Sequence, residues 1–184
     1  MHPQTVRRAA ARKGGTEMKL QREVTAAALA LLAGGRLAQE RRLLQHGRVT
    51  VLEHSAAVAW MSLAIAGWLH LRVDRAALVR GALLHDYFLY DWHESGHAWH
   101  GFTHPRTALQ NAAQDYDLTP TERDIILRHM FPLTPIPPAT AEGLLVCLSD
   151  KICAVIETFG LLEYKMPGLS QCREGTAARD TEKP

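Results

Sequence analysis

The stretch Gly81-Ala82-Leu83-Leu84-His85-Asp86 decides how the rest of the chain is interpreted. Small and apolar residues lead into an adjacent imidazole and carboxylate, with no turn-forming residue between them. A carboxylate buried at the end of an apolar helix needs a partner, because an unpaired buried charge is strongly destabilising. That partner is either a basic side chain in a structural ion pair or a divalent metal ion, and the remaining sequence has to decide between them.

The composition describes one globular domain without a charge bias. A chain of 184 residues with 47% hydrophobic content is long enough for one substantial core. Its 21 basic and 19 acidic side chains nearly balance, so they give no field that would attract a nucleic-acid polymer or an anionic membrane. The most apolar segment, 55–69, is shorter than the ~20 residues that a membrane-spanning helix needs.

The cysteines indicate a reducing compartment. The chain has 3 of them, an odd number without a Cys-x-x-Cys pair, which gives neither a disulfide framework nor a zinc ribbon. We therefore expect a cytoplasmic protein.

Three regions are expected along the chain. Residues 1–17 carry Arg7, Arg8, Arg12 and Lys13 and have no apolar run, so we expect a disordered basic N-terminal extension. Residues 18–165 form the helical domain. Residues 166–184 are polar and contain glycine, which is typical of a flexible C-terminal tail.

The pattern of apolar residues between 17 and 163 predicts helices throughout, and no stretch has the alternation typical of a strand. The expected helices cover about 24–32, 36–46, 50–71, 74–86, 104–113, 120–130 and 139–159. Thr50 and Thr119 each precede a glutamate by three residues and therefore predict capping boxes. Pro105 is expected in the first turn of its helix, where its missing N–H is harmless. Gly81 lies in mid-helix and indicates close approach by another helix, such as the one that bears His54.

Six polar residues stand at helix ends or on apolar helix faces, where pairing with one another would not satisfy them all. They are His54, His85, Asp86, His104, His129 and Asp150. Taken singly, each has an ordinary structural explanation, such as a hydrogen-bonded core histidine. Together, four imidazoles and two carboxylates form a ligand set that first-row divalent ions accept, and without a thiolate a structural zinc site is not expected.

This pattern resembles the H…HD…D signature of the HD-domain superfamily of metal-dependent phosphohydrolases. The residues that carry the signature are His54, His85, Asp86 and Asp150. The intervening His104 and His129 resemble the extra histidines of the dinuclear members of that family. The resemblance covers about residues 49–157 and implies an all-α, single-domain HD-type helical bundle.

The resemblance implies two divalent ions, such as Fe, Mn or Mg, that share Asp86. The ligands it implies are His54, His85, Asp86 and Asp150 for the first ion, and Asp86, His104 and His129 for the second. Two such ions lower the pKa of a bridging water and hold a phosphate ester for in-line attack. The Gly-Tyr-Pro motif of the branch that acts on cyclic dinucleotides is absent, so turnover of cyclic di-GMP is not expected.

Several further residues are candidates for the reaction. The candidate catalytic residues are Asp86, Lys151 and His100. Lys151 and Arg106 could bind phosphate, although either is equally well explained as a solvated helix charge, and Lys151 is expected to point away from Asp150. His100 could support a ligand, protonate the leaving group or be an ordinary loop residue. The residues expected at the entrance or in solvent are His93 and His97.

The leading hypothesis is a metal-dependent phosphohydrolase, a phosphomonoesterase or phosphodiesterase, that acts on a nucleotide or another small phosphate ester. An HD-type di-iron oxygenase acting on a small polyol or phosphonate uses the same imidazoles and carboxylates, so the sequence leaves this alternative open. A non-catalytic HD interaction module is disfavoured, because such modules often lose ligands that this chain retains. The expected partner is therefore a small phosphate ester, and the sequence does not indicate an oligomeric state.

Overall fold

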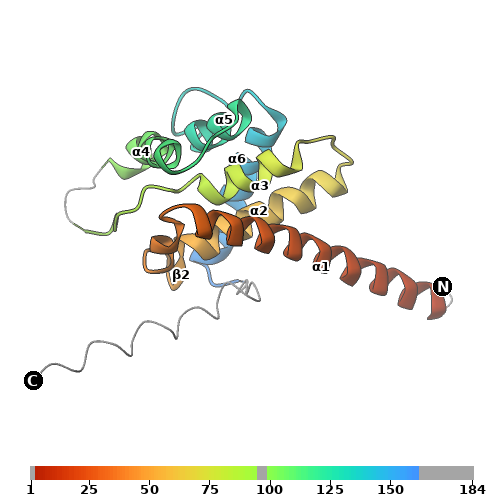
Figure 1. The fold of residues 1–184 in the computed structure, drawn as a ribbon. Coiled ribbons are helices and arrows are strands. Elements are labelled where there is room, and N and C mark those ends of the chain that lie inside the picture. Colours follow the sequence, from red (N-terminus) through yellow and green to blue (C-terminus); the bar gives the residue numbers. More distant parts are fainter. Residues whose placement is uncertain (1–2, 95–98, 162–184) are drawn as a thin grey trace, which may run out of the picture.

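The computed structural model describes residues 3–94 and 99–161, and this part of the chain is mainly helical (Figure 1). It contains six α-helices, one short 3-10 helix and one two-stranded antiparallel sheet. In chain order these are α1 (Pro3–Gly34), η1 (Leu37–Arg41), β1 (Leu44–His46), β2 (Val49–Thr50), α2 (Val51–Trp68), α3 (Arg75–Leu84), α4 (His100–Asp115), α5 (Pro120–Arg128) and α6 (Ala141–Thr158). The predicted all-α class is confirmed.

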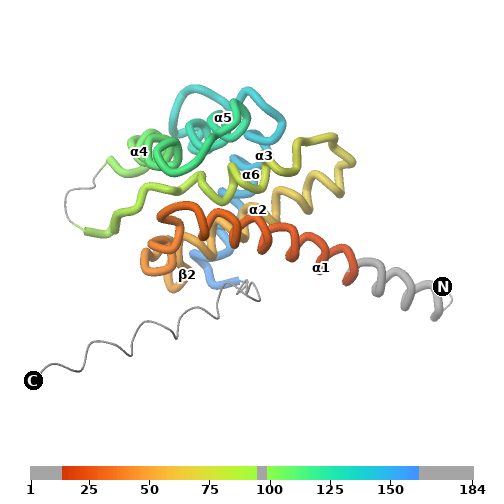
Figure 2. The backbone as a smooth tube through the Cα atoms, viewed as in Figure 1, coloured from red at the N-terminus to blue at the C-terminus, as the bar shows by residue number. Residues whose placement is uncertain are grey.

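Helix α2 lies inside the bundle and is apolar on nearly all sides, as expected for a helix with neighbours around it. It packs against α1, α3 and α6, while α5 packs against α3, α4 and α6. Figure 2 shows the resulting layers, with α1 on one side of α2 and α3 and with α4 and α5 on the other. The helices that carry the six polar residues therefore all belong to one connected core.

The helix starts follow the capping signals in the sequence. Thr50 accepts a hydrogen bond from the backbone N–H of Glu53, and the Glu53 carboxylate accepts one from the Thr50 N–H at 3.0 Å. The same reciprocal box forms between Thr119 and Glu122 at the start of α5. The Asp74 side chain accepts from Ala77 N–H at 3.0 Å and caps α3. The capping boxes predicted at Thr50 and Thr119 are confirmed, and the three caps fix where α2, α3 and α5 begin.

The stretch 36–46 is not the single helix that was predicted. It forms η1 and then β1, which pairs antiparallel with β2 across a turn at Gly47. Gly47 has φ of +60°, a conformation that costs glycine little and other residues more. Strands this short are hard to recognise from alternation of residue type. This hairpin places Gln45 and His46 on strand β1 rather than on a helix.

Helix α4 begins at His100, one turn earlier than predicted, so Pro105 lies inside the helix rather than in its first turn. Proline cannot donate to the carbonyl four residues before it. Two side chains before it bond to carbonyls of the same turn, His104 Nδ1 with His100 O at 2.9 Å and Thr103 Oγ1 donating to Trp99 O at 3.1 Å. The early start places His100 on the same helix as His104.

Gly81 does mark a close helix approach, but the neighbour is α5 and not the helix that bears His54. A Cβ built on Gly81 would lie 2.5 Å from Ile125 Cδ1 and 3.1 Å from Ile125 Cβ. The missing side chain therefore lets α3 and α5 approach closely. These are the two helices that end at His85 and His129.

Helix α1 extends over most of the basic stretch that was expected to lack regular structure. Alanine, arginine, lysine and glutamate, all strong helix formers, are frequent between residues 8 and 23, which accounts for a continuous helix. The part of α1 that enters the core begins at Leu20 and continues with Val24, Ala28 and Leu31, all on one face. The expected tail at 166–184 lies outside the described residues.

Among the described residues, no helix is both long enough and apolar enough to cross a bilayer.

Candidate metal centre

The fold brings the six predicted polar residues together from five helices or their ends. His54 lies in the first turn of α2, and His85 and Asp86 follow directly after α3. The remaining three come from α4, from the end of α5 and from the middle of α6. All six are at most 8% exposed: His54, His85, Asp86, His104, His129 and Asp150.

The carboxylate of Asp86 lies between two pairs of imidazoles. Its Oδ2 is 3.4 Å from His85 Nε2 and 3.9 Å from His54 Nε2. Its Oδ1 is 3.2 Å from His104 Nε2 and 3.6 Å from His129 Nε2. Each oxygen therefore faces a different pair, so that one carboxylate joins two groups of metal-ligand type.

Asp150 completes the first of these groups. Its Oδ1 lies 3.1 Å from His54 Nε2 and 3.7 Å from His85 Nε2. We refer to His54, His85, Asp86 and Asp150 as the first ligand group, and to Asp86, His104 and His129 as the second ligand group. Asp86 is the residue that belongs to both.

Three of the imidazoles are held in one tautomer by the backbone. The Nδ1 atoms of His85, His104 and His129 lie against carbonyl oxygens, which can only accept, so each Nδ1 carries the proton. The acceptors are Ala82 O at 2.7 Å, His100 O at 2.9 Å and Ile126 O at 2.8 Å. In the neutral form of each ring, Nε2 therefore presents its lone pair to the centre, as a metal ligand must.

Several buried ligand-type atoms in the centre lack a hydrogen-bonding partner, which indicates a site for a cation. His85 Nε2 and Asp86 Oδ1 have none. His104 Nε2 and His129 Nε2 approach to 2.8 Å although the backbone bonds place both ring protons on Nδ1. Imidazole nitrogens and carboxylate oxygens are ligands for first-row divalent ions. The two groups fit such ions by donor type, by burial and by direction.

The pKa shifts of residues in the centre are also consistent with a site for a cation. Burial acts against a charge on His54, but its hydrogen bonds with Asp150 and Glu157 outweigh burial and raise the pKa of this imidazole to about 10. Burial also opposes the charge on Asp86, yet the surrounding imidazoles hold its pKa well below the usual range. In contrast, burial and repulsion from neighbouring imidazoles lower the pKa of His129 to about 3. The carboxylates thus favour the positively charged form of His54. His129 stays neutral and can act as a metal ligand.

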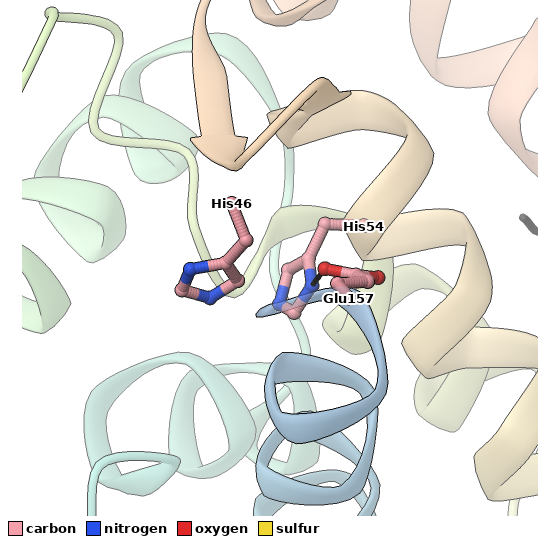
Figure 3. A group of neighbouring side chains, drawn as sticks. All are labelled: His46, His54 and Glu157. Atoms are coloured by element: carbon pink, nitrogen blue, oxygen red, sulfur yellow. Dashed lines mark hydrogen bonds and ion pairs between the residues drawn. The ribbon is translucent and has the colours of Figure 1, made fainter. Parts of the chain in front are cut away.

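Three supporting residues were not predicted. Glu157 Oε2 lies 2.8 Å from His54 Nδ1, and Figure 3 shows its carboxylate against that ring. Gln45 Nε2 donates to Asp86 Oδ2 at 2.6 Å, and the ring of His46 meets that of His54 edge-on at 5.5 Å. Glu157 could have been found from its place two helical turns after Asp150. The other two were hidden by the hairpin that the sequence pattern did not reveal.

A cavity of about 540 Å³ opens beside the centre. Its described lining includes Asp86, His104, His129 and Asp150, so both ligand groups reach it. A reactant in this cavity would therefore contact the residue that joins the two groups.

The candidate catalytic residues Lys151 and His100 also line this cavity. Lys151 does approach Asp150, contrary to expectation, with Nζ 3.8 Å from Oδ2. Its ammonium group also donates to His129 O at 2.8 Å. His100 Nδ1 is hydrogen-bonded to the Tyr90 hydroxyl at 2.9 Å, and its ring stacks on the His104 ring. His100 is therefore positioned to orient a ligand of the second group.

The other candidates are not brought to the centre. Arg106 is exposed and is not among the described residues that line the cavity. His93 is exposed as expected, with Nδ1 3.1 Å from Asp91 Oδ1. His97 lies outside the described residues.

Comparisons with protein-family models, with curated proteins and with solved structures gave no match for this chain. The site is therefore defined by its own geometry. It includes two buried groups of histidine and aspartate that could hold metal ions and that share Asp86, and a third such group, His46, His54 and Glu157, that shares His54 with the first.

Proposed function

We propose that this chain is an HD-type, metal-dependent phosphohydrolase that cleaves a small phosphate ester, a class that includes nucleotides. The observation that carries the proposal is the position of Asp86, whose two carboxylate oxygens face separate pairs of imidazoles. A single structural ion pair needs one charged partner and would not require four imidazoles around one carboxylate. Two cations that share a ligand account for this arrangement.

The donor set suits the chemistry of ester hydrolysis. When bound, two divalent cations lower the pKa of a coordinated water and neutralise charge on phosphoryl oxygens. The chain itself supplies the fixed ligands, since backbone carbonyls lock the imidazoles of His85, His104 and His129 in orientation. Hydrogen bonds of this kind, from the ring nitrogen that does not face the metal, increase the basicity of the ligands and hold their orientation.

Residues of the cavity wall would bind and orient the substrate. The Lys151 ammonium is held at the wall by His129 O and by Cys147 O at 3.2 Å, and it would contact a phosphoryl oxygen. His100 stacks between the rings of Trp92 and His104, which keeps His104 aligned with the second ligand group. Lys151 thus acts on the substrate, whereas His100 is a positioning residue.

The test is metal analysis of protein purified without oxygen, followed by assays of phosphate esters with Mn²⁺, Fe²⁺ and Mg²⁺. We expect about two ions per chain and metal-dependent release of phosphate from at least one ester class. Asp86→Ala should lose bound metal and turnover while its circular dichroism remains helical. Glu142→Gln, which removes a carboxylate from the exposed start of α6, is the matched control and should behave as wild type.

Three outcomes would refute the proposal. A redox-active iron pair whose turnover requires O₂ would identify an oxygenase instead. Purified protein that binds no metal would favour an interaction module. Asp86→Ala with full metal content would show that this carboxylate does not join two metal sites.

A further inference from the structure

We propose that the substrate carries a single phosphoryl group on an apolar organic moiety, an inference that rests on the proposed function. The cavity beside the ligand groups, about 540 Å³ in volume, has a mainly apolar wall. A cavity of this size is typical of small-molecule sites. The character of its wall away from the ligands indicates which part of an ester it would accept.

The charge on the wall fits one phosphoryl group. Lys151 is the one lysine or arginine among the described residues that line the cavity, and Arg106 does not reach it. Together with cations in the two ligand groups, one ammonium can neutralise one phosphoryl group. A second or third phosphate, as in nucleoside di- and triphosphates, would need further basic side chains to pair its charge.

The neutral polar side chains of the wall are few and partly engaged by the protein itself, although Trp92 Nε1 and Gln45 Oε1 have no partner. Gln45 uses its Nε2 on Asp86 at 2.6 Å and leaves Oε1 as an acceptor. His100 uses Nδ1 on the Tyr90 hydroxyl at 2.9 Å. The wall therefore offers few groups for the hydroxyls of a sugar or glycerol, and a buried hydroxyl without a partner is unfavourable.

Apolar side chains form much of the cavity wall. They include Met130, Pro132 and Leu133 from the segment after α5. The first turn of α4 packs closely on this segment, since a Cβ on Gly101 would lie 2.9 Å from Leu133 Cδ2. An apolar group attached to the phosphoryl oxygen would lie against this surface and be removed from water.

Two exposed aromatic residues stand close in the sequence to Gly101, which lines the cavity. Trp99 and Phe102 are 70% and 48% exposed and contact each other with ring centroids 5.8 Å apart. Exposed apolar patches often bind ligands. We expect this pair to contact the far end of an apolar group that is too long for the cavity.

The test compares three monophosphate esters of primary alcohols (hexyl phosphate, glycerol 1-phosphate and AMP) and the triphosphate ATP on the Mn²⁺-loaded protein. Each methylene group of the substrate that is removed from water should increase kcat/KM by a factor of about four. We therefore expect kcat/KM for hexyl phosphate to exceed that for glycerol 1-phosphate and AMP by at least about tenfold, with ATP the poorest. Equal or greater kcat/KM for glycerol 1-phosphate or AMP would overturn the inference and leave the hydrolase function intact.

Two variants test the wall directly. Leu133→Ser should reduce the advantage of hexyl phosphate over glycerol 1-phosphate to about threefold or less. Leu144→Ser changes an exposed leucine on α6, 54% exposed against 44% for Leu133, which is not among the described lining residues, and should retain the full preference. An unchanged preference in Leu133→Ser would overturn the assigned position of the apolar group.

Binding of non-hydrolysable phosphonates separates this inference from the proposed function. If no ester is cleaved, the hydrolase proposal fails, but calorimetric titration of the Mn²⁺-loaded protein with hexylphosphonate and 2,3-dihydroxypropylphosphonate still tests the cavity. At least about tenfold tighter binding of hexylphosphonate supports the apolar moiety. Equal binding of the two compounds overturns it.

Discussion

Glu157 supports the centre from outside the ligand groups, so replacing it tests the support without removing a ligand. Its Oε2 lies 2.8 Å from His54 Nδ1, and its side chain is only 6% exposed (Figure 3). Glu157→Ala would leave the Nδ1 proton of His54 without its acceptor. Glu157→Gln would keep an acceptor oxygen of the same size but remove the charge.

The expected magnitudes follow from the loss of one buried hydrogen bond to a charged group. Such a bond contributes about 1.5–3 kcal/mol, and about 1.4 kcal/mol corresponds to a tenfold change in affinity. Glu157→Ala should therefore weaken one metal site roughly 10- to 140-fold. Glu157→Gln, which keeps a neutral bond and loses about 1 kcal/mol, should weaken it roughly fivefold.

The assay is competition for Mn²⁺ between the protein and a chelator, with both stoichiometry and Kd measured. Only the first ligand group contains His54, so one of two ions should be released more easily while the other is retained. Glu142→Gln removes a carboxylate from the other end of α6 and should leave both affinities unchanged. If Glu157→Ala bound both ions as tightly as wild type, the supporting role of this carboxylate would be wrong.

Three further changes test other parts of the structure. Lys151→Met should lower kcat/KM for a phosphate ester roughly 10- to 100-fold at unchanged metal content, since it removes one charged hydrogen bond to the substrate; an unchanged value would refute this role. Gly81→Ala should lower the free energy of unfolding by about 0.5–2 kcal/mol, because crowding against Ile125 outweighs the gain in helix propensity. Urea denaturation measures this free energy, and a stabilised variant would contradict the close approach of α3 and α5. Asp115→Ala should cost about 1–2 kcal/mol at pH 7 through loss of the 2.8 Å bond from Arg36 Nε. Burial acts to raise the pKa of Asp115, but its hydrogen bonds lower this pKa overall. The stabilisation should therefore be present above the unfolded pKa of about 4 and disappear as the pH falls through the lower folded pKa. A difference in unfolding free energy between variant and wild type that grew at acid pH would contradict this.

The sequence predicted which six polar residues would be buried, because their positions depend on local helical patterns. A capping box at Thr50 places His54 in the first buried turn of α2, and the apolar run before His85 brings that residue to the end of α3. Helix ends and apolar faces can be read from residue spacing alone. The convergence of five helices on Asp86 then follows from burying those faces together.

The parts that the sequence did not reveal depend on contacts between distant segments. The hairpin of β1 and β2 has strands of three and two residues, too short for a recognisable alternation, and it carries Gln45 to Asp86. The neighbour of Gly81 could not be chosen from spacing, because α2 and α5 both have apolar faces that could pack there. The early start of α4 is accompanied by side-chain bonds to Trp99 O and His100 O, and no capping residue in the sequence marks it.

The central claim is that Asp86 joins two metal sites, and the electron paramagnetic resonance spectrum of the Mn²⁺-titrated protein tests it most directly. Two ions that share a carboxylate would be held about 3.5–4 Å apart and would be magnetically coupled. We expect two Mn²⁺ per chain and a coupled spectrum that is lost in Asp86→Ala. One ion per chain, or two ions with independent spectra, would contradict the claim.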